Sequence, residues 1–281
     1  MNDPDSSVPR LDAPLHGLPA WLAHFRAATT PVLSGTVAAV ADLVDHEDAV
    51  DAHMLAETIG TDPLMTLKLL SHVATTSRRE TDVETVVSAL VLMGIGPFFR
   101  TFGTLVGVDS VLGDMPAALT GAHAVLKRSH RAARFALGFA AHRMDPDATV
   151  MHEAALLHDF AEVLLWCHAP ALALEVARRQ AADASLRSAA VQRDVLGIEL
   201  AELRHALMRA WRLPALLVRL DDPRRATEWQ VRSVLLATRV ARHSAHGWDN
   251  AALPDDVTDV GALLQLSPAS ALKLLREIDA D

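Results

Sequence analysis

The feature that most constrains the fold is a helical spacing of apolar residues that runs through almost the whole chain from Leu18 onward. Apolar side chains recur every three or four residues, as on the buried face of an α-helix, for example at Val37, Val40, Ala41 and Val44. No stretch alternates apolar and polar side chains convincingly, and alanine and leucine, which favour helix, are abundant. The spacing therefore predicts an all-α protein.

Local start and stop signals divide this helical pattern into segments. Asp62 can cap free N–H groups and Pro63 suits a first helical turn, so a helix is expected to begin there. Gly94 is expected to end a helix, and a cluster of Gly, Asp and Pro at 108–121 marks a weak boundary. Further helices are expected near 120–143, 148–168, 170–182, 185–196, 198–211, 214–220 and 227–245.

These signals suggest four parts. Residues 1–17 are rich in Pro, Asp and Ser, which predicts a flexible leader. We expect an N-terminal helical bundle at 18–112, a second helical bundle packed on it at 113–245, and a C-terminal helical tail at 246–281. A chain of 281 residues with 51% hydrophobic residues has enough apolar material for a sizeable core, which excludes a disordered chain.

Charge and cysteine content exclude several classes of protein. The chain has 26 Lys and Arg against 35 Asp and Glu, a net charge of −9, which disfavours general nucleic-acid binding. The single cysteine, Cys167, excludes a disulfide framework and a multi-cysteine zinc site. No apolar run reaches the ~20 residues that cross a bilayer, and Met1–Arg10 lacks the apolar stretch of a signal peptide. We therefore expect a soluble cytoplasmic protein that binds no membrane.

The best candidates for a functional site are His158 and Asp159, in the stretch MHEAALLHDFAEVLLW. At helical spacing, His158 falls on the same stripe as Ala154, Ala161 and Leu165, so it is expected to point toward the core. Neutral imidazole and carboxylate are good ligands for divalent transition metals. The pair therefore suggests a metal site.

The stretch LLHDF, together with SHRAARFALGFAA at 129–141, resembles the HD superfamily of metal-dependent phosphohydrolases. In that superfamily a first histidine, a His-Asp doublet and a distant aspartate hold the metal. Three further segments resemble one branch, the HDOD domain, the HD-related output domain of bacterial signalling. They are ETIGTDPLMTLKLLSHVAT, VETVVSALVLMGIGPFFRTF and VLGIELAELRHALMRAWRLP. The resemblance spans about 18–245 and implies an HD-like multi-helix bundle with an N-terminal helical subdomain.

The resemblance places the remaining metal ligands only in part. One register puts the first histidine at His130, and the other puts Ser129 there with His130 beside it. The distant aspartate of true HD hydrolases is expected on the 227–245 helix, where Thr238 takes its place. A neutral threonine cannot replace a carboxylate as an anionic ligand. The degenerate site would then comprise His130, Thr238 and the pair His158 and Asp159.

Two further positions depart from the family pattern. The histidine that the family carries in its last element is Leu200 here, and its following His-His pair aligns with Asp221 and Asp222. HDOD members are regarded as degenerate, non-hydrolytic HD domains, which agrees with these losses. We therefore expect no catalytic residues, no cofactor and no bound metal.

Three functional hypotheses follow. The preferred one is a non-enzymatic signal-transduction module that binds a partner protein or regulatory ligand through a helical groove. The alternative is a divergent HD phosphohydrolase that acts on a nucleotide or cyclic dinucleotide, with a metal at His130, His158 and Asp159. The third is a regulator that binds a nucleotide in the same cavity without turnover. The sequence leaves open a homodimer through the N-terminal bundle.

Overall fold

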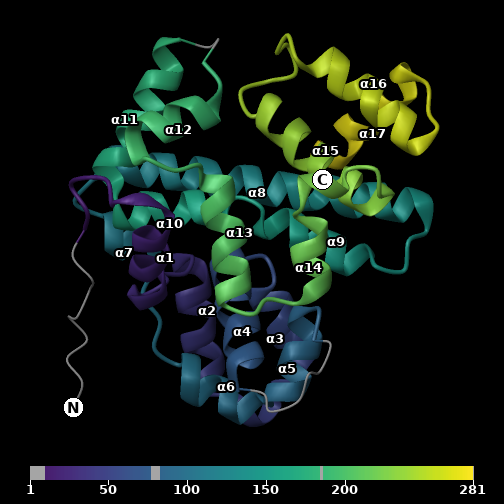
Figure 1. Ribbon diagram of the computed structural model, residues 1–281. Helices are drawn as coiled ribbons and strands as arrows, with labels where there is room; N and C mark the ends of the chain where they lie inside the picture. The colour runs from purple at the N-terminus through teal and green to yellow at the C-terminus, as the bar shows by residue number, and fades with distance from the viewer. Residues whose placement is uncertain (1–9, 77–82, 184–185, 281) are drawn as a thin grey trace.

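The computed structural model describes residues 10–76, 83–183 and 186–280, and these residues form helices with no β-strand. The all-α prediction is confirmed. Figure 1 shows a lower bundle, a long helix that crosses the middle, and two separate helical projections above it.

The lower bundle comes from the first half of the chain (Figure 1). Its buried side chains include Leu64, Phe98 and Phe102, which belong to the main hydrophobic core. Its helices are α2 (Ser34–Val44), the short 3₁₀ helix η1 (Glu47–Ala49), α3 (Ala52–Ile59), α4 (Pro63–Thr76), α5 (Val86–Met93) and α6 (Ile95–Phe102).

The upper part holds the long helix and most of the second half of the chain (Figure 1). Helices α11 and α12 form one projection, and α16 and α17 form the other. The elements are α7 (Val108–Leu112), α8 (Pro116–Arg143), α9 (Ala148–Leu157), α10 (Phe160–His168), α11 (Pro170–Ala182), α12 (Ser188–Leu196), α13 (Leu200–Ala210), α14 (Ala215–Leu220), η2 (Pro223–Arg225), α15 (Trp229–His243), α16 (Leu253–Leu264) and α17 (Pro268–Ala280).

The long helix α8 is the central helix of the upper part. It has 28 residues, so it extends about 42 Å, and it packs against α9, α10, α15 and α17. Small residues set these distances: a Cβ added at Gly121 would lie 2.4 Å from the ring of Trp166 in α10. The absence of a side chain at Gly121 thus brings α10 close to α8. This close approach positions the site described below.

The N-terminal helix α1 (Gly17–Ala27) packs on the upper part, against α13, and not within the lower bundle. The indole Nε1 of Trp21 donates to the carbonyl of Leu196 at 3.1 Å. Ahead of α1, the amide of Leu11 donates to the carbonyl of His168 at 2.7 Å, and Arg10 pairs with Asp114. The predicted flexible leader is therefore held to the body of the protein from residue 10 onward. Residues 1–9 lie outside the described residues.

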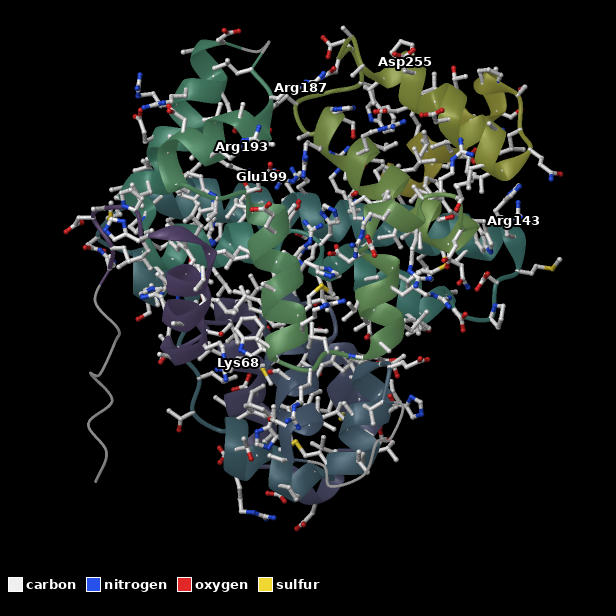
Figure 2. All side chains as sticks on the ribbon, viewed as in Figure 1. Lys68, Arg143, Arg187, Arg193, Glu199 and Asp255 are labelled. Carbon is white, nitrogen blue, oxygen red and sulfur yellow. The ribbon has the colours of Figure 1, made fainter. Side chains whose placement is uncertain are left out.

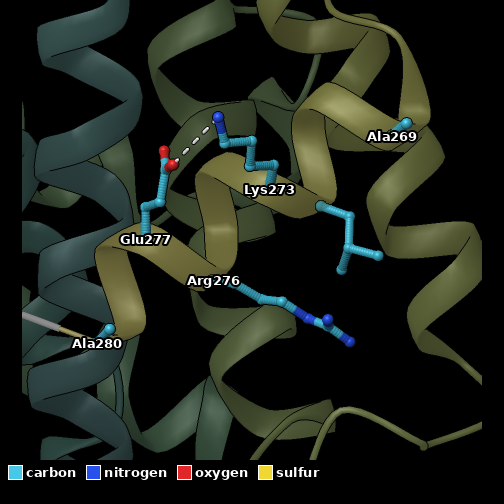
Figure 3. Close-up of a pocket in the computed structure, with 6 residues that line it drawn as sticks. Ala269, Lys273, Arg276, Glu277 and Ala280 are labelled. Atoms are coloured by element: carbon cyan, nitrogen blue, oxygen red, sulfur yellow. Dashed lines mark ion pairs between the residues drawn. The ribbon is translucent and has the colours of Figure 1, made fainter.

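The C-terminal tail folds back onto α8 and α15. Arg131 of α8 donates to Asp279 of α17 at 2.7 Å, and a Cβ at Gly138 would lie 2.4 Å from Ile278. The outward face of α17 is polar: Figure 3 shows Lys273 beside Glu277, an ion pair of 3.6 Å. The predicted tail is helical and is part of the packed structure.

Asp62 ties the start of α4 to the start of α2. Its carboxylate is fully buried and accepts hydrogen bonds from the amides of Leu64 at 2.8 Å and Met65 at 3.0 Å. It also accepts from the amide of Leu33, 29 residues earlier, at 2.7 Å. Burial raises the pKa of Asp62, against the effect of these bonds. The Asp-Pro sequence thus begins a helix, as predicted, and also anchors a distant loop.

Replacing Asp62 with alanine should therefore lower the free energy of unfolding by about 2 kcal/mol, because three amides would lose a buried acceptor. Urea unfolding followed by circular dichroism measures the change. Asp51 is the matched control, since it is also an N-cap but is exposed and accepts only from Met54. Equal losses in Asp62→Ala and Asp51→Ala would contradict the anchoring role of Asp62.

No single helix within the described ranges is both long and apolar enough to cross a membrane. One bent pair, Ala148–His168 with Pro170–Ala182, passes the test by length and composition, with a bend of 117°.

Candidate functional site

The His-Asp pair (His158 and Asp159) lies at a break between two helices. Helix α9 ends at Leu157 and α10 begins at Phe160, whereas the sequence predicted one continuous helix over 148–168. The carbonyl of Asp159 accepts the amide of Glu162 at 3.0 Å, so the residue already starts the new helix. The break places both side chains of the pair on the wall of one cavity.

The carboxylate of Asp159 is taken up by positively charged and polar neighbours. Arg128 of α8 donates through Nε to Oδ2 at 2.7 Å. The other oxygen lies 3.0 Å from Nδ1 of His158 and 3.5 Å from Nη2 of Arg242 in α15. Burial alone would raise the pKa of Asp159, but the charge of Arg128 and the hydrogen bond of His158 hold it well below its usual range. Asp159 is therefore a buried carboxylate that stays ionised, and its negative charge is balanced by its positively charged neighbours.

Arg128 connects α8 to α10 through two carboxylates. Its Nη2 donates to Glu162 at 2.7 Å, while Nε donates to Asp159. Only 15% of the side chain is exposed. Burial lowers the pKa of Arg128, but the charges and hydrogen bonds of Asp159 and Glu162 together raise it above its usual value. Such a two-pronged guanidinium bridge is both strong and directional.

The imidazole of His158 is kept neutral. Burial and the charge of Arg204 in α13 lower its pKa, against the opposing effect of Asp159. Arg204 also donates through Nη1 to the carbonyl of His158 at 3.0 Å, and through Nε to Asp221 at 2.9 Å. A second buried ion pair thus holds the helix break from the side of α13 and α14.

The structure brings together only part of the predicted site. Thr238 borders a cavity with His158, and its hydroxyl donates to the carbonyl of Leu235 at 2.9 Å. His130 lies elsewhere: its Nε2 is 2.6 Å from the carbonyl of Thr61, at the lower bundle. Because His130 follows Arg128 by two positions on one helix, its side chain points about 200° away from that of Arg128. On α8 it is therefore Arg128, and not His130, whose side chain reaches the His-Asp pair.

Four charged residues at this site were not predicted from the sequence: Arg128, Glu162, Arg204 and Arg242. A partial signal existed for Glu162, which follows Asp159 by three residues and so shares its helix face. The three arginines gave no such signal, since their spacing in the sequence resembles that of solvated surface residues.

The residues present do not fit the metal ion of an HD hydrolase. Within 10–76, 83–183 and 186–280, no three or more His, Cys, Asp or Glu side chains gather in a group that could hold a metal. Arg128 already supplies a full positive charge at Asp159, at hydrogen-bond distance. A divalent cation at the same carboxylate would have to displace this guanidinium or sit against its charge.

Two cavities are lined by residues of the pair, and a third is lined by its neighbours Arg128, Glu162 and Arg242. The central cavity, of about 260 Å³, is lined by His158, Asp159 and Leu200. The α11 cavity, of about 310 Å³, reaches from Arg128 toward α11, and the α15–α16 cavity, of about 510 Å³, lies between those two helices. Arg242 lines all three. Figure 2 shows Glu199, which lines the central cavity, near Arg193 of α12, with which it forms an ion pair.

The solved structures that share this fold include two of bacterial proteins. The response regulator MmoQ of Methylococcus capsulatus is 23% identical, with 88% of this chain and 98% of that chain covered and a TM-score of 0.64. A virulence factor of Campylobacter jejuni is 18% identical, with coverages of 93% and 98% and a TM-score of 0.64. The comparison with curated proteins finds no match. The HD-like helical architecture that the motifs implied is thus confirmed.

The family follows from the sequence itself. The family model of the HDOD domain matches residues 30–221, which is more than half of the chain. That range includes Asp62, the His-Asp pair and the break between α9 and α10. The chain therefore belongs to the HDOD domain family.

Proposed function

We propose that the protein is a non-hydrolytic signal-transduction module that binds a partner protein through the groove formed by the three cavities around the His-Asp pair. The observation that carries the proposal is the bridge from Arg128 to Asp159, which puts an internal cation where a metallohydrolase needs a metal. Membership of the HDOD family supports a signalling role. The structurally similar MmoQ is described as a response regulator, which agrees with it.

Metal-assisted hydrolysis needs an ion held firmly, with an open position for an activated water. Here the pair contributes two side chains, while Thr238 and Leu200 border the cavities without adding an anionic or imidazole ligand. Both oxygens of Asp159 already have partners. The alternative of a divergent phosphohydrolase finds no supporting observation at this site.

The first test is enzymatic. Protein purified without chelator is incubated with bis(p-nitrophenyl) phosphate and with cyclic dinucleotides, in separate reactions with Mg²⁺, Mn²⁺ and Fe²⁺. We expect no turnover above the buffer control, and the same trace for wild type and His158→Ala. Metal-dependent turnover that disappears in His158→Ala would overturn the non-hydrolytic assignment.

The second test concerns the groove. Ala189 lines the central cavity and is half-buried, whereas its neighbour Ala190 is exposed and lines none of the three cavities. Ala189→Trp should therefore block partner capture from a lysate of the source organism, and Ala190→Trp should not. Identical sets of captured proteins for both variants would contradict binding through this groove.

A further inference from the structure

A row of arginines on α15 borders the α15–α16 cavity. Arg232, Arg239 and Arg242 line it, and Asp259 of α16 is the one carboxylate among its lining residues. Three arginines against one carboxylate give its lining an excess of positive charge, in a chain with a net charge of −9. Such a local excess attracts ligands of the opposite sign.

The three arginines are not equally engaged. Arg239 is the most engaged of the three, since it forms ion pairs with Asp256, at 2.6 Å, and with Asp259. Arg232 comes no closer than 3.9 Å to Asp259, and its side chain is 42% exposed. Arg242 lies 3.5 Å from Asp159 and is 47% exposed. Because a guanidinium group has five N–H donors, Arg232 and Arg242 can each take up a further carboxylate.

The spacing of these two arginines selects the shape of the ligand. Arg232 and Arg242 are ten positions apart on one helix, so their Cα atoms are separated by about 15 Å along its axis. A separation of this size favours an extended ligand over a single phosphate group. An extended peptide rises about 3.3 Å per residue, so roughly five residues cover it.

The cavity also presents apolar side chains between the two arginines. Leu235 and Leu236 line it, together with the polar His158, Thr238 and His243. Leu235 also borders the central cavity beside the His-Asp pair. An extended segment with carboxylates at its two ends and an apolar side chain between them therefore matches both the charge and the surface of the site.

We propose that the α15–α16 cavity binds an extended acidic segment of the partner protein, with one carboxylate on Arg232 and another on Arg242. This inference rests on the proposed function and adds the chemistry of the partner. Arg239 is expected to stay with α16, because its ion pairs hold that helix in place.

The test is selection from a display library of random peptides on the full chain, in buffer that contains EDTA. The double variant Arg232→Ala, Arg242→Ala is compared with wild type. The control is Arg219→Ala, Arg225→Ala, which removes two arginines of similar exposure that pair with Glu228 outside the cavity. Melting temperatures confirm that the variants fold.

We expect peptides selected on wild type to be enriched in Asp and Glu flanking an apolar residue. Fluorescence anisotropy should show at least a tenfold loss of affinity for these peptides in the Arg232, Arg242 variant, none in the control, and weaker binding at high salt. Selected peptides without acidic enrichment, or equal binding by both double variants, would overturn the proposal. Displacement of the peptides by stoichiometric inorganic pyrophosphate would do so as well, in favour of a small anionic ligand.

The readout is independent of hydrolysis. Metal-dependent turnover would disprove the proposed function while leaving peptide binding measurable in EDTA. Conversely, an absence of acidic preference would reject this inference while the difference between Ala189→Trp and Ala190→Trp still tested the groove.

Discussion

Replacing Arg128 with alanine should destabilise the protein by about 3 to 5 kcal/mol, which is the usual cost of removing one partner from a buried ion pair. The variant leaves Asp159 and Glu162 without their shared cation, and Asp159 is buried. His158 and Arg242 remain near Asp159, but the former is neutral and the latter is 3.5 Å away. Urea unfolding at neutral pH measures the loss.

The control for Arg128→Ala is Arg178→Ala. Arg178 also bridges a glutamate, Glu175, at 2.8 Å, but it does so on the exposed surface of α11. Solvent screens such a pair, so the unfolding midpoint of this variant should not change measurably. If Arg128→Ala and Arg178→Ala unfold at the same urea concentration, the bridge from Arg128 to Asp159 does not stabilise the fold as predicted.

The same bridge shows where prediction from the sequence stops. Periodicity identified the helices, and the Asp-Pro signal at Asp62 placed the start of α4 correctly. The motif containing His158 and Asp159 located the site. The residue of α8 that faces the pair could not be found in this way, because a shift of one position rotates a side chain by about 100° around the helix. Arg128 and His130 differ by two positions, and they contact Asp159 and the carbonyl of Thr61, respectively.

The helix break was hidden for a related reason. Residues 148–168 keep a helical pattern across His158 and Asp159, since both sides of the break are buried and pack against α8. The interruption depends on the partners of the pair, Arg128 from α8 and Arg204 from α13, which are distant in the sequence. Local spacing carries no information on such contacts.

Long-range contacts also fix segments whose placement the sequence pattern does not reveal. A polar, proline-containing leader was expected to be flexible, but from residue 10 it is fixed by hydrogen bonds to Asp114 and to the carbonyl of His168. Trp21 then reaches Leu196, so α1 lies with the upper part although it precedes the lower bundle in the chain. Only the tertiary arrangement reveals these contacts.

The second large effect is expected at Glu153, in the middle of α9. Its Oε1 accepts the amide of Val86 at 2.9 Å, at the start of α5, while Oε2 is buried without a hydrogen-bond partner. Burial raises the pKa of Glu153 to about 8, although the bond from Val86 opposes the shift. Near neutral pH the side chain is therefore protonated in the folded protein and ionised in the unfolded chain.

The sign of the pH dependence follows from this difference. Because the folded pKa lies above the ordinary value of 4.5, the contribution of Glu153 is fully present below about pH 4.5. It is lost as the pH rises through 8. Glu153→Gln keeps the acceptor for Val86 and removes the charge. At pH 8.5 this variant should be more stable than wild type by about 2 to 4 kcal/mol, while the two should be similar at pH 5.

The amide of glutamine sets a limit on this gain. Its NH₂ group would occupy the place of Oε2, which has no partner, so part of the stabilisation is lost to an unsatisfied donor. Urea unfolding at both pH values measures the difference, with the exposed Glu202→Gln as the control. Parallel pH profiles for wild type and Glu153→Gln would mean that Glu153 is ionised in the folded state. In that event the hydrogen bond from Val86 of α5 to Glu153 of α9 would be accepted by a charged carboxylate instead of a neutral one. Helix α9 leads directly into the His-Asp pair.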